Sequence, residues 1–253
     1  MAVVGRVAGL NRYPVKSMQG ESLSDAEVGE LGIPNDRIYG VRDVATTKVL
    51  SAKREPRLLL AAAATNNGEV SVTVPGQAPM SAEDPRVSVA LSEWLGREVR
   101  LERATPTTEA FYEFQTEGDP AADVIDLPVL DGSFFDLAPL HLLTQASLAS
   151  AARLDPGLDW DIRRFRPTVL VEAASDGDYP EDAWVGHELD IGGVRADVIM
   201  PTIRCAMPMA AQPGLSAQPA LMPRLKQGHN ALLGVYATVL APGHLAVGDE
   251  LSL

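Results

Sequence analysis

Residues 189–208, with the sequence LDIGGVRADVIMPTIRCAMP, carry a clear fold signal and the only cysteine of the chain. Apolar and polar residues alternate on both sides of Gly192-Gly193, which is the pattern of two antiparallel strands joined by a tight turn. We therefore predict a β-hairpin over 189–199. The second strand of this hairpin leads the chain to Cys205, so the position of the thiol depends on the hairpin.

Cys205 has no second cysteine with which to form an intramolecular disulfide. It is therefore either a small buried apolar residue or a reactive group. The adjacent Arg204 favours the thiolate form, which attacks electrophiles and binds metals. Pro201 and Pro208 flank the cysteine and predict a shaped loop rather than the interior of a helix. These residues alone leave both readings of the thiol open.

The composition is that of a soluble globular protein, with 253 residues, 46% hydrophobic and 22% charged. This length allows one large domain or two modest ones. The chain has 21 basic and 34 acidic residues, which gives a formal net charge of −13. Such a charge repels phosphate backbones and anionic lipids, so we expect neither nucleic acid nor a membrane as partner.

The chain shows no targeting signal. No segment approaches the roughly 18 consecutive apolar residues of a membrane span. Residues 1–6 lack the charged and then apolar plan of a secretory signal. A single unpaired cysteine also fits a reducing compartment. We predict a cytoplasmic protein.

Short strand patterns separated by turn residues dominate the chain. They fall at 3–10, 36–43, 58–64, 70–74, 168–171, 233–240 and 245–253. Helical spacing occurs at 87–95, before Gly96, and at 141–153, while 207–223 has the composition of an irregular loop. We therefore predict a mainly β architecture of the α+β class with a few helices and β-barrel character. The change of composition over 104–128 marks either a join between two halves or a long internal loop.

Arg163, Arg164 and Arg166 form a basic cluster in an acidic chain. Guanidinium groups match phosphate oxygens in a bidentate fork, so the cluster suits a phosphate-bearing ligand. Ion pairs with the many surface acids are the competing interpretation.

A second basic group lies in the first half of the chain and consists of Arg12, Lys16, Arg37 and Arg42. Lys16 follows a proline turn, where backbone amides and an ammonium group can together hold an anion. This chemistry indicates anion binding and does not name a reaction.

The sequence holds few other signs of chemistry. His141, His187, His229 and His244 do not have metal-ligand spacing, and one cysteine cannot build a thiolate cage. We expect His141 to be a cap or core residue rather than a base. No P-loop, nucleophile elbow or dinucleotide-binding turn is present.

Six short motifs occur in an order that resembles the MOSC family, named for the molybdenum-cofactor sulfurase C-terminal domain, including the β-barrel domain that often precedes it. Those of the first half are Tyr13-Pro14-Val15-Lys16-Ser17, Asp36-Arg37-Ile38-Tyr39 and Lys53-Arg54-Glu55-Pro56-Arg57-Leu58. Those of the second half are Ala138-Pro139-Leu140-His141-Leu142-Leu143-Thr144, Arg164-Phe165-Arg166-Pro167 and Arg204-Cys205. The pattern is most similar to members of the family that reduce amidoximes and other N-hydroxylated bases.

The resemblance implies an N-terminal β-barrel-like domain at 1–110, packed on a MOSC β-barrel at 111–253. It also implies a molybdenum cofactor between them, with Cys205 as thiolate ligand of the metal and as the catalytic residue. The implied cofactor-binding residues are Lys16, Ser17, Arg37, Arg166, Thr168, Arg204 and Tyr236. The implied reaction is reduction of a small N-hydroxylated substrate, with electrons from a separate ferredoxin or flavoprotein reductase.

The sequence departs from the family pattern in one segment and at two single positions. Ala206-Met207-Pro208-Met209 replaces a Thr-Thr-Val-Asp segment after the cysteine, Ala138 replaces a serine, and Thr168 replaces an asparagine. The expected acidic residue near the metal is thereby removed and the substrate side becomes more apolar. Two other hypotheses stay open: a sulfur carrier with a persulfide on Cys205, and a family member that uses its cleft for another small molecule without the cofactor.

Overall fold

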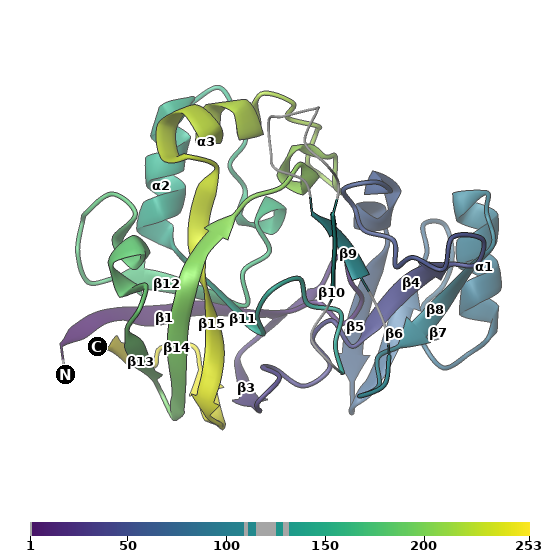
Figure 1. Ribbon diagram of the computed structural model, residues 1–253, viewed down its shortest axis with the longest axis horizontal. Helices are drawn as coiled ribbons and strands as arrows, with labels where there is room; N and C mark the ends of the chain where they lie inside the picture. Colours follow the sequence, from purple (N-terminus) through teal and green to yellow (C-terminus); the bar gives the residue numbers. More distant parts are fainter. Residues whose placement is uncertain (1, 109–110, 115–124, 129–131) are drawn as a thin grey trace.

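The computed structural model describes residues 2–108, 111–114, 125–128 and 132–253. Its larger unit is a closed barrel (Figure 1) in which neighbouring strands run in the order β12-β11-β15-β14-β13-β17-β1, and β1 pairs with β12 to close the circle. The strands of the barrel are β1 (Val3–Arg12), β11 (Leu140–Thr144), β12 (Val169–Ala173), β13 (Glu188–Ile191), β14 (Val194–Ile203), β15 (Leu232–Ala241) and β17 (Glu250–Ser252). β11 and β12 pair in parallel, and the other neighbours are antiparallel.

Alternation along the strands fills the barrel with apolar side chains. On β14, Val194, Ala196 and Val198 are buried in the main core, while Arg195 and Ile199 are exposed. The hairpin predicted over 189–199 is confirmed, with Ile191 opposite Val194 across the turn. Gly192 has a φ of 56° in this turn, a conformation that glycine adopts without steric cost.

Smaller elements surround the barrel. β2 (Glu21–Leu23) extends its sheet beside β1, and β3 (Asp25–Val28) pairs with β16 (Gly243–Ala246). Helices α2 (Gln145–Leu154) and α3 (Leu221–His229) lie together over one end of the barrel (Figure 1), where a second apolar cluster includes Leu143 and Leu233 from the strands beneath. Three short 3₁₀ turns complete this unit: η2 (Ile162–Arg164), η3 (Pro180–Trp184) and η4 (Met207–Met209).

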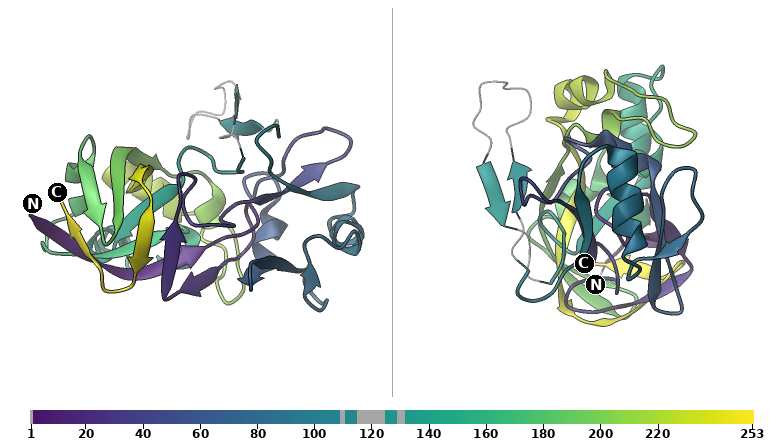
Figure 2. Two further views of the ribbon diagram at one scale, coloured as in Figure 1. Left: turned by 90° about the horizontal axis from the view of Figure 1, so that it is seen from below. Right: turned by 90° about the vertical axis from the view of Figure 1, so that its right-hand side faces the viewer.

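A smaller unit with its own core lies beside the barrel (Figure 2). It contains β4 (Tyr39–Asp43) paired with β8 (Val99–Arg103), and the three-stranded sheet β5 (Ala62–Asn66), β6 (Glu69–Thr73) and β7 (Met80–Ser81). The 3₁₀ turn η1 (Pro56–Leu60) and helix α1 (Arg86–Leu95) pack with these strands, and β9 (Phe111–Phe114) pairs with β10 (Ile125–Pro128).

β1 links the two units, because it begins in the barrel and ends where the smaller unit starts (Figure 2). The residues after it bond to the other unit through backbone groups: Lys16 N–H donates to Tyr39 C=O, and Arg37 N–H donates to Tyr13 C=O. The proline turn that carries Lys16 is therefore fixed at the junction of the two units.

The predicted fold class is confirmed, since the chain is mainly β with three α-helices among the described residues and a closed barrel. The helix predicted at 87–95 is α1, which ends at Gly96. The domain boundary at 110/111 stays a prediction, because residues 109–110 and part of the 104–128 join lie outside the described residues.

Several predicted boundaries were wrong. The helix predicted over 141–153 begins only at Gln145, because residues 140–144 form the fully buried strand β11 and Thr144 caps the helix. A continuous apolar run does not distinguish a buried strand from a buried helix face. The strand predicted over 58–64 begins at Ala62, after η1, and the one over 36–43 begins at Tyr39.

The loop predicted over 207–223 contains η4 and the start of α3. Pro223 lies in the first turn of α3, where a proline removes no helical hydrogen bond. The strand predicted over 245–253 is two strands, β16 and β17, which pair with different partners.

Two adjacent arginines have opposite structural roles. Arg164 is fully buried and donates to the carbonyl oxygens of Pro208, Ala210 and Ser216, which fixes the loop that follows Cys205. Arg163 is half exposed and pairs with Asp161. Arg163 also donates to the carbonyl oxygen of Pro213, but it does so at the surface, so Arg164 is the buried support of this loop.

Replacing Arg164 by methionine is expected to lower the free energy of unfolding by on the order of 3 kcal/mol, because buried carbonyl oxygens lose their donors. The matched variant Arg163→Met is expected to cost less than about 1 kcal/mol, as an exposed ion pair does. Urea unfolding of both variants measures the difference. Equal losses would contradict these roles.

Candidate functional site

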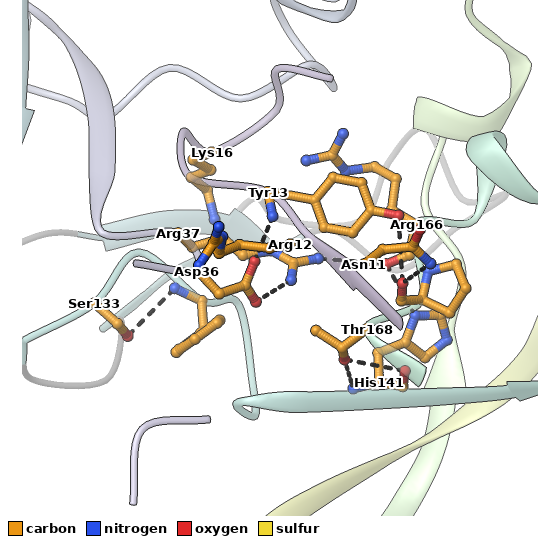
Figure 3. A network of polar contacts seen from close by, with 12 residues as sticks. Asn11, Arg12, Tyr13, Lys16, Asp36, Arg37, Ser133, His141, Arg166 and Thr168 are labelled. Atoms are coloured by element: carbon orange, nitrogen blue, oxygen red, sulfur yellow. Dashed lines mark hydrogen bonds and ion pairs between the residues drawn. The ribbon is translucent and has the colours of Figure 1, made fainter. Parts of the chain in front are cut away.

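Several of the residues predicted to bind the cofactor, namely Lys16, Arg37, Arg166 and Thr168, belong to a polar network at the junction of the barrel and the smaller unit (Figure 3). Tyr13, Lys16, Asp36 and Arg37 come from the segments between β1 and β4, and they lie next to His141, Arg166 and Thr168 of the barrel. The closure of the barrel makes this meeting possible, since β1 pairs with β12 immediately after Arg166 and Thr168.

Tyr13 lies between two arginines. The guanidinium carbon of Arg166 is 4.1 Å from the centre of its ring, and that of Arg37 is 4.5 Å from it. Arg37 also forms an ion pair with buried Asp36. Burial would lower the pKa of Arg37, but the charge of Asp36 and the hydrogen bond to it, together with the nearby Tyr13, raise that pKa. The ring of Tyr13 therefore contacts the guanidinium groups of both arginines.

Arg166 and Arg204 are buried cations without a carboxylate partner in the described part of the chain. Their exposed fractions are 5% and 6%. Nη2 of Arg166 and Nε of Arg204 are buried and have no hydrogen-bond partner among the described residues. Burial and then the repulsion of Arg37 lower the pKa of Arg166 to about 10, and burial lowers the pKa of Arg204. An anion is the ligand that such a pair of donors lacks.

Lys16 and Asp136 form an ion pair on the same side of the site. Lys16 is buried and also donates to the carbonyl oxygen of Phe134 at 2.8 Å. Burial would raise the pKa of Asp136, but the charges of Lys16 and Lys53 lower it to about 2. The side chain of Asp136 is 37% exposed, so this carboxylate is both ionised and accessible.

Cys205 and Tyr236 lie within electrostatic reach of this group. Cys205 follows β14 on an irregular segment, as its flanking prolines predicted, and is half-buried. Burial and then the charge of Asp136 raise the pKa of Tyr236 to about 12, with Arg204 acting in the opposite direction.

His141 is a buried residue of β11, as expected for a core position. Its Nδ1 is 3.4 Å from the carbonyl oxygen of Arg166, and its Nε2 is 3.3 Å from Nη1 of Arg204. A carbonyl oxygen only accepts and a guanidinium only donates, so the ring is neutral with its proton on Nδ1. Burial, followed by the charge of Arg204, lowers the pKa of His141 well below its usual value.

Two of the residues predicted to bind the cofactor, Thr168 and Ser17, form hydrogen bonds to backbone groups of the protein. The hydroxyl of Thr168 accepts from the N–H of His141 at 2.6 Å and donates to its C=O at 3.1 Å. Ser17 has a φ of 67°, and its hydroxyl accepts from the N–H of Ala52. Ser17 lies next to Lys16 on the same turn, whereas Thr168 acts on the site through His141.

The structure separates the basic clusters of the sequence. Arg12 pairs with Glu21, and Arg42 pairs with Glu102. Arg163 and Arg164 make the contacts described above, so each cluster contributes only some of its members to the site. Spacing alone could not show which arginines are paired.

Sequence reasoning missed Asp136 and did not assign roles to Tyr13 or Asp36. The signal for Asp136 was a single acid in the apolar run Phe134-Phe135-Asp136-Leu137. Tyr13 and Asp36 stand inside the quoted motifs, but only the fold shows that the ring separates two arginines and that Asp36 pairs with one of them.

Comparison with known proteins agrees with this architecture. Residues 4–110 match the model of the MOSC N-terminal beta barrel domain, and residues 130–252 match that of the MOSC domain. These matches cover nearly the whole chain in the expected order. The chain belongs to the MOSC family.

Two curated relatives are similar over nearly the whole chain. Mitochondrial amidoxime reducing component 2 of Homo sapiens is 27% identical over 283 residues, covering 97% of this chain and 82% of the human protein. Mitochondrial amidoxime-reducing component 1 of Homo sapiens is 25% identical over 307 residues, covering 99% and 83%. Among solved structures, the YUAD protein from Bacillus subtilis aligns with a TM-score of 0.49 and 13% identity, covering 98% of this chain and 94% of that one.

Among the described residues, no group of three or more His, Cys, Asp or Glu side chains is arranged to hold a metal ion. Within the same residues, no helix has both the length and the apolar character needed to cross a bilayer.

The neutral state of His141 predicts a pH dependence of stability. In the unfolded chain a histidine has a pKa near 6.5. Below that pH the unfolded state binds a proton that folded His141 does not bind, so wild-type stability falls relative to His141→Gln. The difference in unfolding free energy between the two proteins should be level above about pH 7 and should fall towards pH 5, by up to about 1.4 kcal/mol per pH unit. A level difference over the whole range would contradict a neutral, buried His141.

Proposed function

We propose that this protein is a molybdenum-cofactor-dependent oxidoreductase that reduces small N-hydroxylated compounds, with Cys205 as thiolate ligand of the metal. The observation that carries this proposal is the pair of buried guanidinium groups, Arg166 and Arg204, each with an N–H group that has no partner among the described residues. Both guanidinium groups belong to the matched MOSC domain, and Arg204 directly precedes Cys205, the only cysteine of the sequence. The relatives named as amidoxime reducing components support the class of substrate.

The residues present fit a phosphate-bearing group. Lys16, Arg37, Arg166 and Arg204 supply positive charge, of which Asp36 and Asp136 balance only a part. Guanidinium groups bind phosphate oxygens in a bidentate fork. A thiolate is a soft metal ligand, which suits Cys205 for a metal delivered by the cofactor.

We assign the cofactor to Lys16, Ser17, Arg37, Arg166, Arg204 and Tyr236, with Cys205 on the metal. Thr168 is left out of this set, because its hydroxyl already bonds to the backbone of His141 on both sides. When bound, the cofactor supplies the metal that accepts electrons and passes them to the substrate.

The residues of the chain itself would bind the substrate and orient it. Removal of oxygen from an N-hydroxyl group consumes two electrons and two protons and releases water. Asp136 is ionised and accessible, so its carboxylate can accept a hydrogen bond from a substrate N–H group. The loop after Cys205, which Arg164 holds, carries the apolar residues Ala206 and Met207, so we expect an apolar surface next to the cysteine. A separate ferredoxin or flavoprotein reductase would supply the electrons, and we retain a cytoplasmic location as part of the proposal.

Protein made in a host that synthesises the cofactor should contain nearly equimolar molybdenum and pterin. Elemental analysis measures the metal, and fluorescence of the released, oxidised pterin measures the organic part. Protein free of both would contradict the proposal. It would favour sulfur transfer or a cleft used for another molecule, and a persulfide on Cys205 would decide between these two.

Single substitutions should separate the metal ligand from the anion-binding groups. Cys205→Ser is expected to lose molybdenum more than pterin, because it removes only the bond to the metal. Arg166→Met is expected to weaken retention of both by about tenfold to a hundredfold, since a charge-assisted hydrogen bond is lost. Arg163→Met is the matched control and should retain both. Full metal content in Cys205→Ser would exclude the ligand role.

A further inference from the structure

His141 is buried between two site arginines and has not been given a role in the chemistry. Its ring donates to the backbone carbonyl of Arg166 and accepts from the side chain of Arg204. It belongs to β11 of the barrel, whereas Arg204 follows β14. The ring therefore connects the backbone of Arg166 with the side chain of Arg204.

We propose that His141 is a positioning residue, which holds the guanidinium of Arg204 so that its Nε–H faces the anion shared with Arg166. This inference rests on the proposed function only for the identity of the anion as the phosphate of the cofactor. The arrangement itself requires an oxyanion and no metal.

Of the three guanidinium nitrogens of Arg204, only Nε is buried without a partner among the described residues. Nη2 donates to the carbonyl oxygen of Phe165 at 2.6 Å, and Nη1 donates to Nε2 of His141. A guanidinium is planar and rigid, so fixing two of its nitrogens also fixes Nε–H. That Nε is buried and is the atom without a partner. Without the bond to His141, the group could pivot about the contact with Phe165.

The ring of His141 is itself held in place on two sides. The hydroxyl of Thr168 bonds to both backbone groups of His141. Gly234 of β15 has a φ of 84°, and a Cβ atom at that position would lie 2.5 Å from Nε2 of His141 and 2.6 Å from the carbonyl oxygen of Leu142. The backbone of β15 therefore passes close to Nε2 of His141, and a residue with a side chain at this position would press on the imidazole.

Two substitutions of His141 each keep one of the two hydrogen bonds of the ring and remove the other. The side chain of glutamine reaches about as far as Nε2, so the amide oxygen in His141→Gln can accept from Arg204. The side chain of asparagine reaches only as far as Nδ1, so His141→Asn can donate to the carbonyl of Arg166 but leaves Arg204 without an acceptor. Each variant keeps one bond, so a merely structural role would affect both in a similar way.

The experiment measures binding of inorganic pyrophosphate to cofactor-free protein by calorimetry, and retention of pterin by protein from a cofactor-producing host. We expect His141→Asn to weaken pyrophosphate binding by about tenfold or more, the value of one hydrogen bond to a charged group. His141→Gln should bind within about threefold of wild type.

The outcomes distinguish this inference from the proposed function. Wild-type binding in both His141 variants, or equal weakening in both with equal loss of unfolding temperature, would overturn the positioning role while leaving the function intact. Wild-type protein that binds neither pyrophosphate nor pterin would overturn the anion site itself. Weak binding in His141→Asn with recovery in His141→Gln, at similar unfolding temperatures, is the result that the geometry predicts.

Discussion

The burial of two positive charges without a carboxylate partner is the constraint on which the site depends. Arg166 and Arg204 are almost completely removed from solvent, and each retains an N–H group with no acceptor among the described residues. An uncompensated buried charge is unfavourable, so the surrounding structure must hold it in place. Tyr13, Phe165 and His141 do so, by contact with the two guanidinium groups.

The barrel makes this arrangement possible by bringing distant parts of the sequence to one place. β1 closes the barrel against β12, and the chain then leaves it through the turn that carries Tyr13 and Lys16. β14 ends immediately before Arg204 and Cys205. The site therefore combines the first residues of the smaller unit with the ends of barrel strands, and neither part contains all of it.

Much of the fold was predictable, because alternation and turn glycines determine strands such as those of the 189–199 hairpin. Residues 140–144 were misassigned because a strand buried on all sides carries no alternation. For the candidate site, short motifs pointed to Lys16, Arg37, Arg166 and Cys205, whose binding roles belong to the proposed function. The selection of Arg166 over its neighbours Arg163 and Arg164, the carboxylate of Asp136 and the bonds of His141 depend on contacts between distant segments, which no local pattern encodes.

The most direct test of the anion site is a crystal structure of protein purified from a cofactor-producing host, with diffraction data collected at the molybdenum absorption edge. The account predicts an anomalous peak within bonding distance of Sγ of Cys205 and a phosphate group in contact with Nη2 of Arg166 and Nε of Arg204. A metal bound elsewhere, or a phosphate held by other residues while these two nitrogens remain without a partner, would contradict it.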